Sequence, residues 1–172
     1  MSIDEEKLNS VENALLPKMT VGVAIIASNA EQVIRDCIES FIEHVDQCIV
    51  VVNNSTDKTE EICRSIKGVE VQNFEWCDDF AIARNYSFSF LNTDFFLWVD
   101  ADDTIYQPEN LRKLANEVPQ DIGGIWFPYH YALDEIGNVT TIYERERLLR
   151  AKLGWVWRSR IHETVSPLIP GK

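Results

Sequence analysis

Uninterrupted apolar runs alternate, along the first hundred residues, with segments whose apolar residues recur every three or four positions. Runs of this kind cover residues 20–27, 48–52 and 95–99, and each has the length of one strand. An apolar run without polar alternation is typical of a strand that is buried on both faces. A shorter strand is predicted at 69–71, so four strands precede residue 100.

Helices are predicted in the intervals between these strands. Residues 33–42 place apolar side chains at helical spacing, which indicates an amphipathic helix. Further helices are expected to begin near Lys58 and at Phe80. Asp78 or Asp79 is expected to cap the second of these. Strands that alternate with helices predict an α/β fold, in which a mostly parallel sheet carries helices on both faces.

The pattern changes after residue 120. Residues 123–129 and 138–143 flank a turn at 134–137, which predicts an antiparallel pair of strands. Further short strands or loops are expected at 148–149 and 155–157. The C-terminal portion is therefore predicted to be small and antiparallel.

The chain has 172 residues, enough for one domain, and its 45% apolar residues can fill a core. We assign residues 19–172 to this domain and residues 1–18 to an acidic arm or short helix. No signal peptide and no apolar run long enough for a transmembrane segment is visible, so we expect a cytoplasmic protein. Four cysteines lack CxxC spacing and are expected to be buried, reduced thiols: Cys37, Cys48, Cys63 and Cys77.

The charge of the chain restricts its partners. A net charge of −12 argues against nucleic acid, because binding it requires basic surface that neutralises phosphates. The charge is also uneven, since 7 of the 16 basic residues fall within 144–172, together with only 3 acidic ones. An anionic ligand held beside acidic residues needs a cation, which a metal ion or this basic segment could supply.

Polar residues follow three of the predicted strands, at 28–29, 53–57 and 100–103. The carboxyl ends of parallel strands meet at one edge of a sheet, where ligands of such folds bind. We therefore expect these three clusters to form one site.

The acidic cluster contains Asp100 and Asp102 directly after a buried strand. Carboxylates without Cys or His beside them suit Mg²⁺ or Mn²⁺, which bridge to substrate phosphates. One alternative is a solvated acidic loop. Another is a phosphatase nucleophile motif from Asp100 to Thr104, although such motifs usually follow the first strand and have glycine where this chain has Asp103.

Five short elements occur in a specific order along the chain: residues 21–29, 49–59, 79–85, 98–103 and 161–163. Together they resemble family 2 glycosyltransferases, which have the GT-A fold. The Asp-Phe-x-x-Ala-Arg-Asn element at 79–85 and the His-Glu pair at 162–163 are similar to a bacterial subgroup with lipopolysaccharide-core and bacteriocin peptide glycosyltransferases.

The resemblance implies a nucleotide-sugar donor, with UDP as the first expectation. It also implies an ion, Mg²⁺ or Mn²⁺, held by Asp102, Asp100 and His162. The acceptor would be a saccharide, a lipid-linked group or a peptide. The residues that the resemblance assigns to the nucleotide-sugar are Ala27, Asn29, Asn53, Asp79, Arg84, Asp100 and Ala101.

The resemblance also implies transfer with inversion, in which a carboxylate takes the proton of the acceptor. Asp103, Glu163 and Glu146 are candidates for this base, and the first two are favoured because they adjoin the expected metal ligands. A non-catalytic module that binds a nucleotide or sugar, or a truncated transferase domain, is the alternative function.

Two positions depart from the family pattern. Asn53 stands where the family usually has aspartate, and Lys58 stands where it usually has glycine, which leaves the base of the donor open. His44 and His130 are expected to be structural. Four aromatic residues could stack on sugars or belong to the core: Trp126, Tyr129, Trp155 and Trp157.

Overall fold

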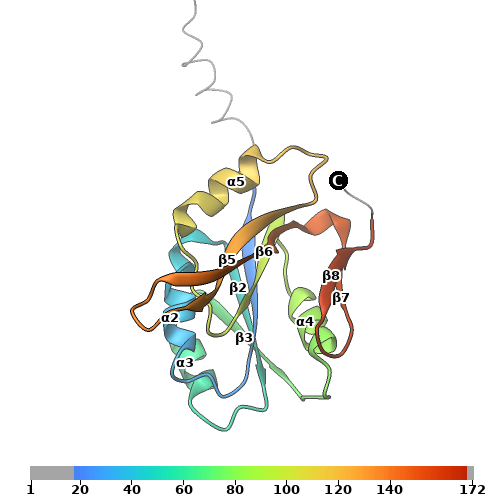
Figure 1. Cartoon of the computed structure of the whole chain (residues 1–172). Coiled ribbons are helices and arrows are strands. Elements are labelled where there is room, and N and C mark those ends of the chain that lie inside the picture. Colours follow the sequence, from blue (N-terminus) through green and yellow to red (C-terminus); the bar gives the residue numbers. More distant parts are fainter. Residues whose placement is uncertain (1–17, 170–172) are drawn as a thin grey trace, which may run out of the picture.

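The computed structural model describes residues 18–169 and has a six-stranded sheet at its centre (Figure 1). The order of the strands is β3-β2-β1-β4-β6-β5. Strands β1 to β4 are parallel to one another, whereas β6 runs antiparallel to both β4 and β5. The bounds are β1 Val21–Ala27, β2 Gln47–Asn53, β3 Val69–Phe74, β4 Phe95–Asp100, β5 Gly124–Leu133 and β6 Val139–Arg150.

Helices cover both faces of the sheet (Figure 1). Helices α2 (Ile34–Glu39), α3 (Thr59–Ser65) and α5 (Leu111–Glu117) pack on one face. Helix α4 (Phe80–Phe88) covers the other face together with the hairpin of β7 (Trp155–Arg158) and β8 (Thr164–Pro167). Short 3-10 turns occur at η1 Ile42–His44, η2 Pro108–Asn110 and η3 Ala151–Leu153.

Strand β1 shows why its apolar run has no polar alternation. Val21, Val23 and Ile25 pack into the core beneath α2 and α5. Gly22, on the opposite face, has no room for a side chain, because a Cβ atom there would lie 2.7 Å from Thr93 Oγ1. Both faces of the strand are therefore buried, and the predicted α/β fold with helices on both faces is confirmed.

The C-terminal portion is antiparallel, as predicted, but its strands are longer than the pattern suggested. The β5–β6 hairpin turns at residues 134–137, where Asp134 N donates to Asn138 O at 2.8 Å. Leu148 and Leu149 belong to β6 and pair with β4, rather than forming a separate element. The predicted arm at 1–18 lies outside the described residues, apart from Lys18.

Three of the four cysteines are buried, as expected, but Cys77 is exposed. Burial raises the pKa of Cys37 to about 12 and that of Cys63 to about 11, so these thiols stay protonated at neutral pH. Cys77 lies between β3 and α4, in a segment that the pattern wrongly placed in the interior. Within residues 18–169, no helix is long and apolar enough to cross a membrane.

Candidate active site

A cavity of about 530 Å³ opens at the edge of the sheet where β1, β2 and β4 end. The predicted convergence of polar clusters at this edge is therefore observed. Trp76, from the connection between β3 and α4, and Phe80, the first residue of α4, form another wall, with ring centroids 4.8 Å apart. The predicted site residues that line the cavity are Ala27, Asn29, Asn53, Ala101 and Asp102.

Asn53, the last residue of β2, carries a polar atom without a partner. The residue is 6% exposed, and within the described chain its Oδ1 atom receives no hydrogen bond. A buried acceptor in this state costs about 1–3 kcal/mol, which a ligand that donates a hydrogen bond would recover. Asn53 therefore brings an amide group with an unsatisfied oxygen to the wall of the cavity.

Two asparagines with left-handed backbone conformations hold the loops around the cavity through their side chains. Asn29 has a φ of 48° and its Oδ1 accepts from Thr56 N at 2.9 Å. Asn54 has a φ of 45° and its Oδ1 accepts from Trp76 N at 3.1 Å. Non-glycine residues rarely adopt this conformation, and asparagine does so most readily. Asn29 was predicted to contact the nucleotide. In the structure its side-chain Oδ1 joins the loop after β1 to the loop after β2.

The acidic residues after β4 form a closed turn. Asp103 N donates to Asp100 O at 3.0 Å, and Asp100 N donates to Asp103 Oδ2 at 3.3 Å. Asp102 projects from this turn, is exposed, and makes no hydrogen bond or ion pair with any described residue. The turn thus presents one free carboxylate to the cavity.

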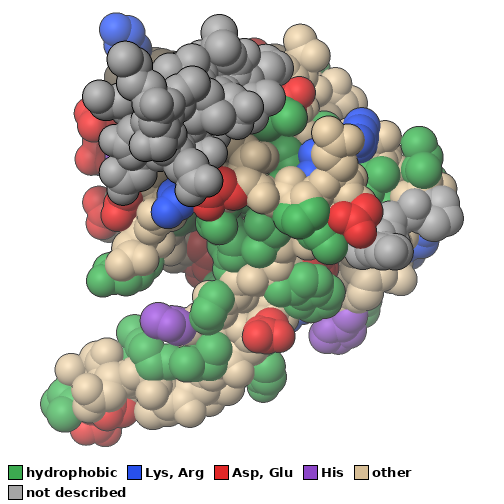
Figure 2. Space-filling view, turned by 90° about the horizontal axis from the view of Figure 1, so that it is seen from above, with side chains coloured by type: hydrophobic (Ala, Val, Ile, Leu, Met, Phe, Trp, Pro, Cys, Tyr) green, Lys and Arg blue, Asp and Glu red, His purple; other side chains and the backbone are tan. Residues whose placement is uncertain are grey.

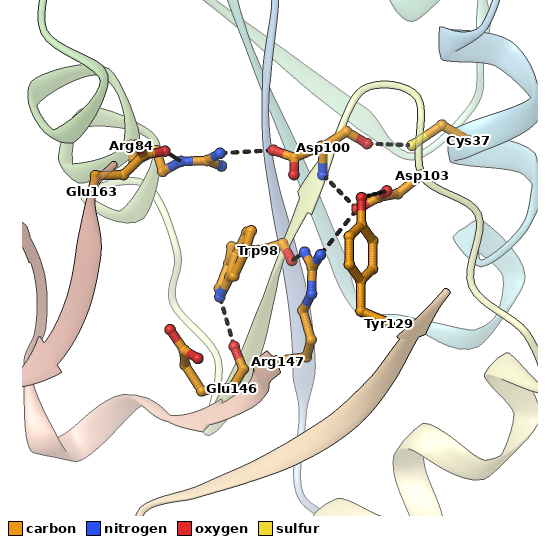
Figure 3. A network of polar contacts seen from close by, with 9 residues as sticks. All are labelled: Cys37, Arg84, Trp98, Asp100, Asp103, Tyr129, Glu146, Arg147 and Glu163. Carbon is orange, nitrogen blue, oxygen red and sulfur yellow. Dashed lines mark hydrogen bonds and ion pairs between the residues drawn. The ribbon is translucent and has the colours of Figure 1, made fainter. Parts of the chain in front are cut away.

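Arg84 of α4 links Asp100, the first residue of the acidic turn, to Glu163 (Figure 3). Its guanidinium donates to Asp100 Oδ1 at 2.7 Å and to Glu163 Oε1 at 2.8 Å. It also lies beside two indole rings that contact each other, 5.0 Å from the Trp98 ring centroid and 4.8 Å from that of Trp157. Arg84 and Glu163 were both predicted as site residues, and the structure joins them through one buried ion-pair network.

Arg147 of β6 holds the other end of the turn (Figure 3). It donates to Asp103 Oδ2 at 3.1 Å and to Trp98 O at 2.8 Å, and lies 3.7 Å from the Trp98 ring centroid. Tyr129 donates its hydroxyl to Asp103 Oδ1 at 3.0 Å. Sequence reasoning missed Arg147, although the basic excess in 144–172 pointed to its neighbourhood.

Burial changes the acid–base properties of this group. It raises the pKa of Asp103, an effect that the charge of Arg147 opposes. It also lowers the pKa of Arg147, and here Asp103 acts in the opposite direction. The pKa of Tyr129 rises to about 12, through burial and then through the negative charge of Asp103. At neutral pH, Tyr129 is therefore a hydrogen-bond donor to the carboxyl group.

The three residues expected to hold a metal ion do not form a ligand cluster by themselves. His162 is exposed and has a φ of 53°, whereas its neighbour Glu163 points inward to Arg84. No group of three or more His, Cys, Asp and Glu residues in the described part of the chain could hold a metal. Asp100 and Asp102 still offer carboxylate oxygens of the kind that Mg²⁺ uses when phosphates complete its shell.

The remaining candidates have structural contacts. Asp79 caps α4, accepting from Ile82 N at 3.1 Å. Glu146 accepts from Trp98 Nε1 through its backbone oxygen, at the end of that ring remote from Asp100 (Figure 3). Trp157 is buried against Trp98, and Trp155 donates to Arg150 O. These tryptophans thus belong to the packing beneath the site.

The fold and the cavity define an α/β domain with a ligand site at the carboxyl edge of its sheet, beside an acidic turn. A family model described as glycosyl transferase family 2 matches residues 22–164. The chain therefore belongs to glycosyltransferase family 2, and the family predicted from the ordered motifs is confirmed.

Curated relatives share part of this chain. The SPbeta prophage-derived glycosyltransferase SunS of Bacillus subtilis is 31% identical over 105 residues, which is 60% of this chain and 24% of that protein. A TPR repeat-containing protein of Synechococcus elongatus is 29% identical over 85 residues, 49% of this chain and 21% of that protein. The chain thus spans about a quarter of the length of these relatives.

Solved structures share the fold. Staphylococcus aureus TarS 1–349 in complex with UDP matches with a TM-score of 0.51 and 26% identity, over 57% of this chain and 31% of that one. Mycobacterium tuberculosis glucosyl-3-phosphoglycerate synthase, in complex with Mn²⁺, UDP and phosphoglyceric acid, matches with a TM-score of 0.52 and 20% identity. That match covers 72% of this chain and 46% of the other, and it supports the fold alone.

Proposed function

We propose that this domain transfers a sugar from a nucleoside-diphosphate sugar, with UDP as the nucleotide, to an acceptor. The observation that carries the proposal is the wall of the cavity, where Asn53, whose buried Oδ1 has no hydrogen-bond donor among the described residues, lies beside Asp102 and two aromatic rings. The N3–H of uracil is such a donor. Trp76 and Phe80 offer aromatic surface beside it for the base. The complex of TarS 1–349 with UDP supports uracil as the base.

A divalent ion, Mg²⁺ or Mn²⁺, is part of the proposal. Asp102 is free and faces the donor cavity, and Asp100 keeps one carboxylate oxygen that Arg84 does not engage. Two carboxylates with substrate phosphates are a normal ligand set for such an ion. When bound, the ion would offset the negative charge that develops on the departing diphosphate. Arg84 stands beside Asp100 and would add a second positive charge there.

Transfer with inversion requires the acceptor to attack the anomeric carbon from the face opposite the diphosphate, while a carboxylate takes its proton. Asp103 and Glu163 are the proposed candidates, and each is held by a buried arginine. Arg147 and Tyr129 keep Asp103 in one orientation, which such a role needs. Replacing Asp103 by Asn and Glu163 by Gln in separate variants would assign the base by the larger loss of kcat.

Calorimetric titration with UDP, in the presence of Mn²⁺ and then of a chelator, tests the proposal. We expect binding that the chelator weakens. Asp102→Ala should remove the effect of Mn²⁺ and leave the fold intact, because Asp102 is exposed and unpaired. Asp36→Ala, an exposed aspartate of α2 outside the cavity, is the matched control. If UDP, GDP and dTDP all fail to bind the unaltered protein, the proposal is wrong.

A non-catalytic nucleotide-binding module is the second candidate. One observation favours it, since both candidate bases are already ion-paired to arginine side chains. Hydrolysis of UDP-glucose and UDP-N-acetylglucosamine separates the two functions. Release of UDP that Asp103→Asn or Glu163→Gln abolishes would support the transferase, whereas tight binding with no release would support the module.

A further inference from the structure

A second cavity, of about 350 Å³, lies on the other side of the acidic turn. Ala101 and Asp102 face the donor cavity, whereas Asp103 faces this second one together with Tyr129 and Arg147. Helix α5 and strand β5 form its side walls. The four-residue turn is thus a shared wall between two cavities, the arrangement that a reaction between two bound molecules requires.

Tyrosines lead from this cavity out along the β5–β6 hairpin. The rings of Tyr129 and Tyr131 lie 6.3 Å apart, and those of Tyr131 and Tyr143 lie 5.2 Å apart. Tyr131 is 62% exposed, Tyr143 is 50% exposed, and Tyr106 at the rim of the cavity is 86% exposed. Figure 2 shows the hairpin projecting from the body with hydrophobic side chains on its surface. We call Tyr129, Tyr131 and Tyr143 the tyrosine row, and Tyr106 lies at the rim of the cavity.

The walls combine apolar side chains, such as Val99, Leu114 and Phe127, with polar ones, and a saccharide has both kinds of surface. A pyranose ring has an apolar C–H face, which packs on an aromatic ring, and hydroxyl groups at its edge. Tyr131 and Tyr143 supply exposed rings whose hydroxyls can also bond, whereas the Tyr129 hydroxyl is used by Asp103. Thr104, Gln107 and Asn110 line the cavity and add hydroxyl and amide groups.

The charges in the cavity favour a neutral ligand. Arg147 is the one Lys or Arg among the described residues that line it, and this guanidinium is already paired with Asp103. Asp134 and Glu135 at the hairpin turn, and the net charge of −12, add negative potential. The described walls therefore offer no unpaired Lys or Arg to a phosphate or carboxylate group of an acceptor.

We propose that the second cavity and the tyrosine row bind a neutral oligosaccharide, whose terminal sugar is the acceptor. Its terminal unit occupies the cavity beside Asp103, and the following units lie along Tyr131 and Tyr143. The inference rests on the proposed function, because that function assigns the first cavity to the donor.

Amide chemical shifts of the ¹⁵N-labelled protein test the proposal, with cellotetraose, maltotetraose and chitotetraose as probes. We expect at least one tetrasaccharide to shift amides within 104–107, 129–131 and 143, with weaker shifts for glucose. UDP with Mn²⁺ should instead shift Asn53 and Asn54. A serine- and cysteine-containing heptapeptide is the competing probe, and its binding at the tyrosine row in place of the saccharides would overturn the proposal.

Single substitutions test which residues bind the saccharide. Tyr106→Ala and Tyr131→Ala should each weaken the tetrasaccharide about fivefold, as expected for the loss of one stacked ring, with unchanged affinity for UDP. Ile136→Ala, which alters a residue 85% exposed at the hairpin turn, is the matched control and should change neither affinity. Absence of saccharide shifts at the row, with UDP bound normally, overturns this inference alone. Absence of UDP binding overturns the proposed function.

Discussion

Strand β6 contains two buried arginines, three residues apart, whose surroundings differ in one respect that matters for function. Arg147 and Arg150 are 7% and 5% exposed, and each guanidinium lies over an aromatic ring of β4. Arg150 donates to the backbone oxygens of Val118, Pro119 and Ile122, so it anchors the segment that connects α5 to β5. Arg147 donates to one backbone oxygen and to a carboxylate.

Arg150 therefore stabilises the fold, whereas Arg147 also fixes the orientation of a residue in the candidate site. The oxygens that Arg150 satisfies belong to peptide groups, which carry no net charge. The oxygen that Arg147 satisfies belongs to Asp103, in the turn that faces both cavities. Loss of Arg147 would leave a buried carboxylate without its cation, which costs more than an unbonded carbonyl.

The largest expected effect on the candidate site comes from Arg147→Met. We expect a loss of about 3–5 kcal/mol in the free energy of unfolding, because Asp103 would stay buried and unpaired. Arg150→Met should destabilise the fold as well, because three backbone oxygens lose hydrogen bonds from a charged group, worth about 1.5–3 kcal/mol each. Urea unfolding measures both. Titration with UDP and Mn²⁺ should show weaker binding only for Arg147→Met. An equal loss of UDP affinity in both variants would contradict the different roles of the two arginines.

Removing both partners sharpens the comparison. In the double variant Asp103→Asn with Arg147→Met, the buried charge is gone together with its cation. We expect the loss of stability to be about 1–3 kcal/mol smaller than the sum for the two single variants. Asp103→Asn combined with Arg150→Met is the control cycle, and its effects should add to within about 0.5 kcal/mol. Additivity in both cycles would show that Arg147 and Asp103 are not coupled.

Tyr129→Phe removes the second hydrogen bond to Asp103 and should cost about 1 kcal/mol. The pKa of Tyr129 is raised to about 12 from its usual 10.0, so its contribution is complete below pH 10 and is lost as the pH rises through 12. Absorbance at 295 nm during alkaline titration should show one late-titrating tyrosine, which is absent in the variant. Tyr143→Phe, at a half-exposed ring, should leave that late step in place.

The smallest effect is expected for an arginine on the surface. Arg64 pairs with Glu60 within α3 at 2.7 Å, but its side chain is 52% exposed. Arg64→Met should cost about 0.3–0.5 kcal/mol, and the difference should shrink in high salt, because water and ions screen such a pair. An Arg64 effect as large as that of Arg147 would show that burial does not govern these ion pairs.

Sequence patterns correctly predicted which segments of the chain surround the site. The strand at 95–99 and the acidic residues after it follow from local hydrophobicity, and parallel strands must end at a common edge. Asn53 and Asp102 were therefore placed at one site, and both line the cavity where β1, β2 and β4 end. The roles of Asp103, Glu163 and His162 could not be predicted in the same way. They depend on which side chains turn inward, and Glu163 does so while His162 stays exposed.

What the sequence alone determined is the α/β order of elements, the family and the position of the acidic turn, since each depends on short-range periodicity or on ordered motifs. The tertiary structure decided the pairing of Arg147 with Asp103, 44 residues away, and of Arg84 with Glu163, 79 residues away. It also decided that the buried oxygen of Asn53 has no partner within residues 18–169 and that the acidic turn separates two cavities. Such contacts arise when β6 pairs beside β4 and α4 packs against the β7–β8 hairpin. No local pattern contains that information, because the partners are neighbours only after the chain has folded.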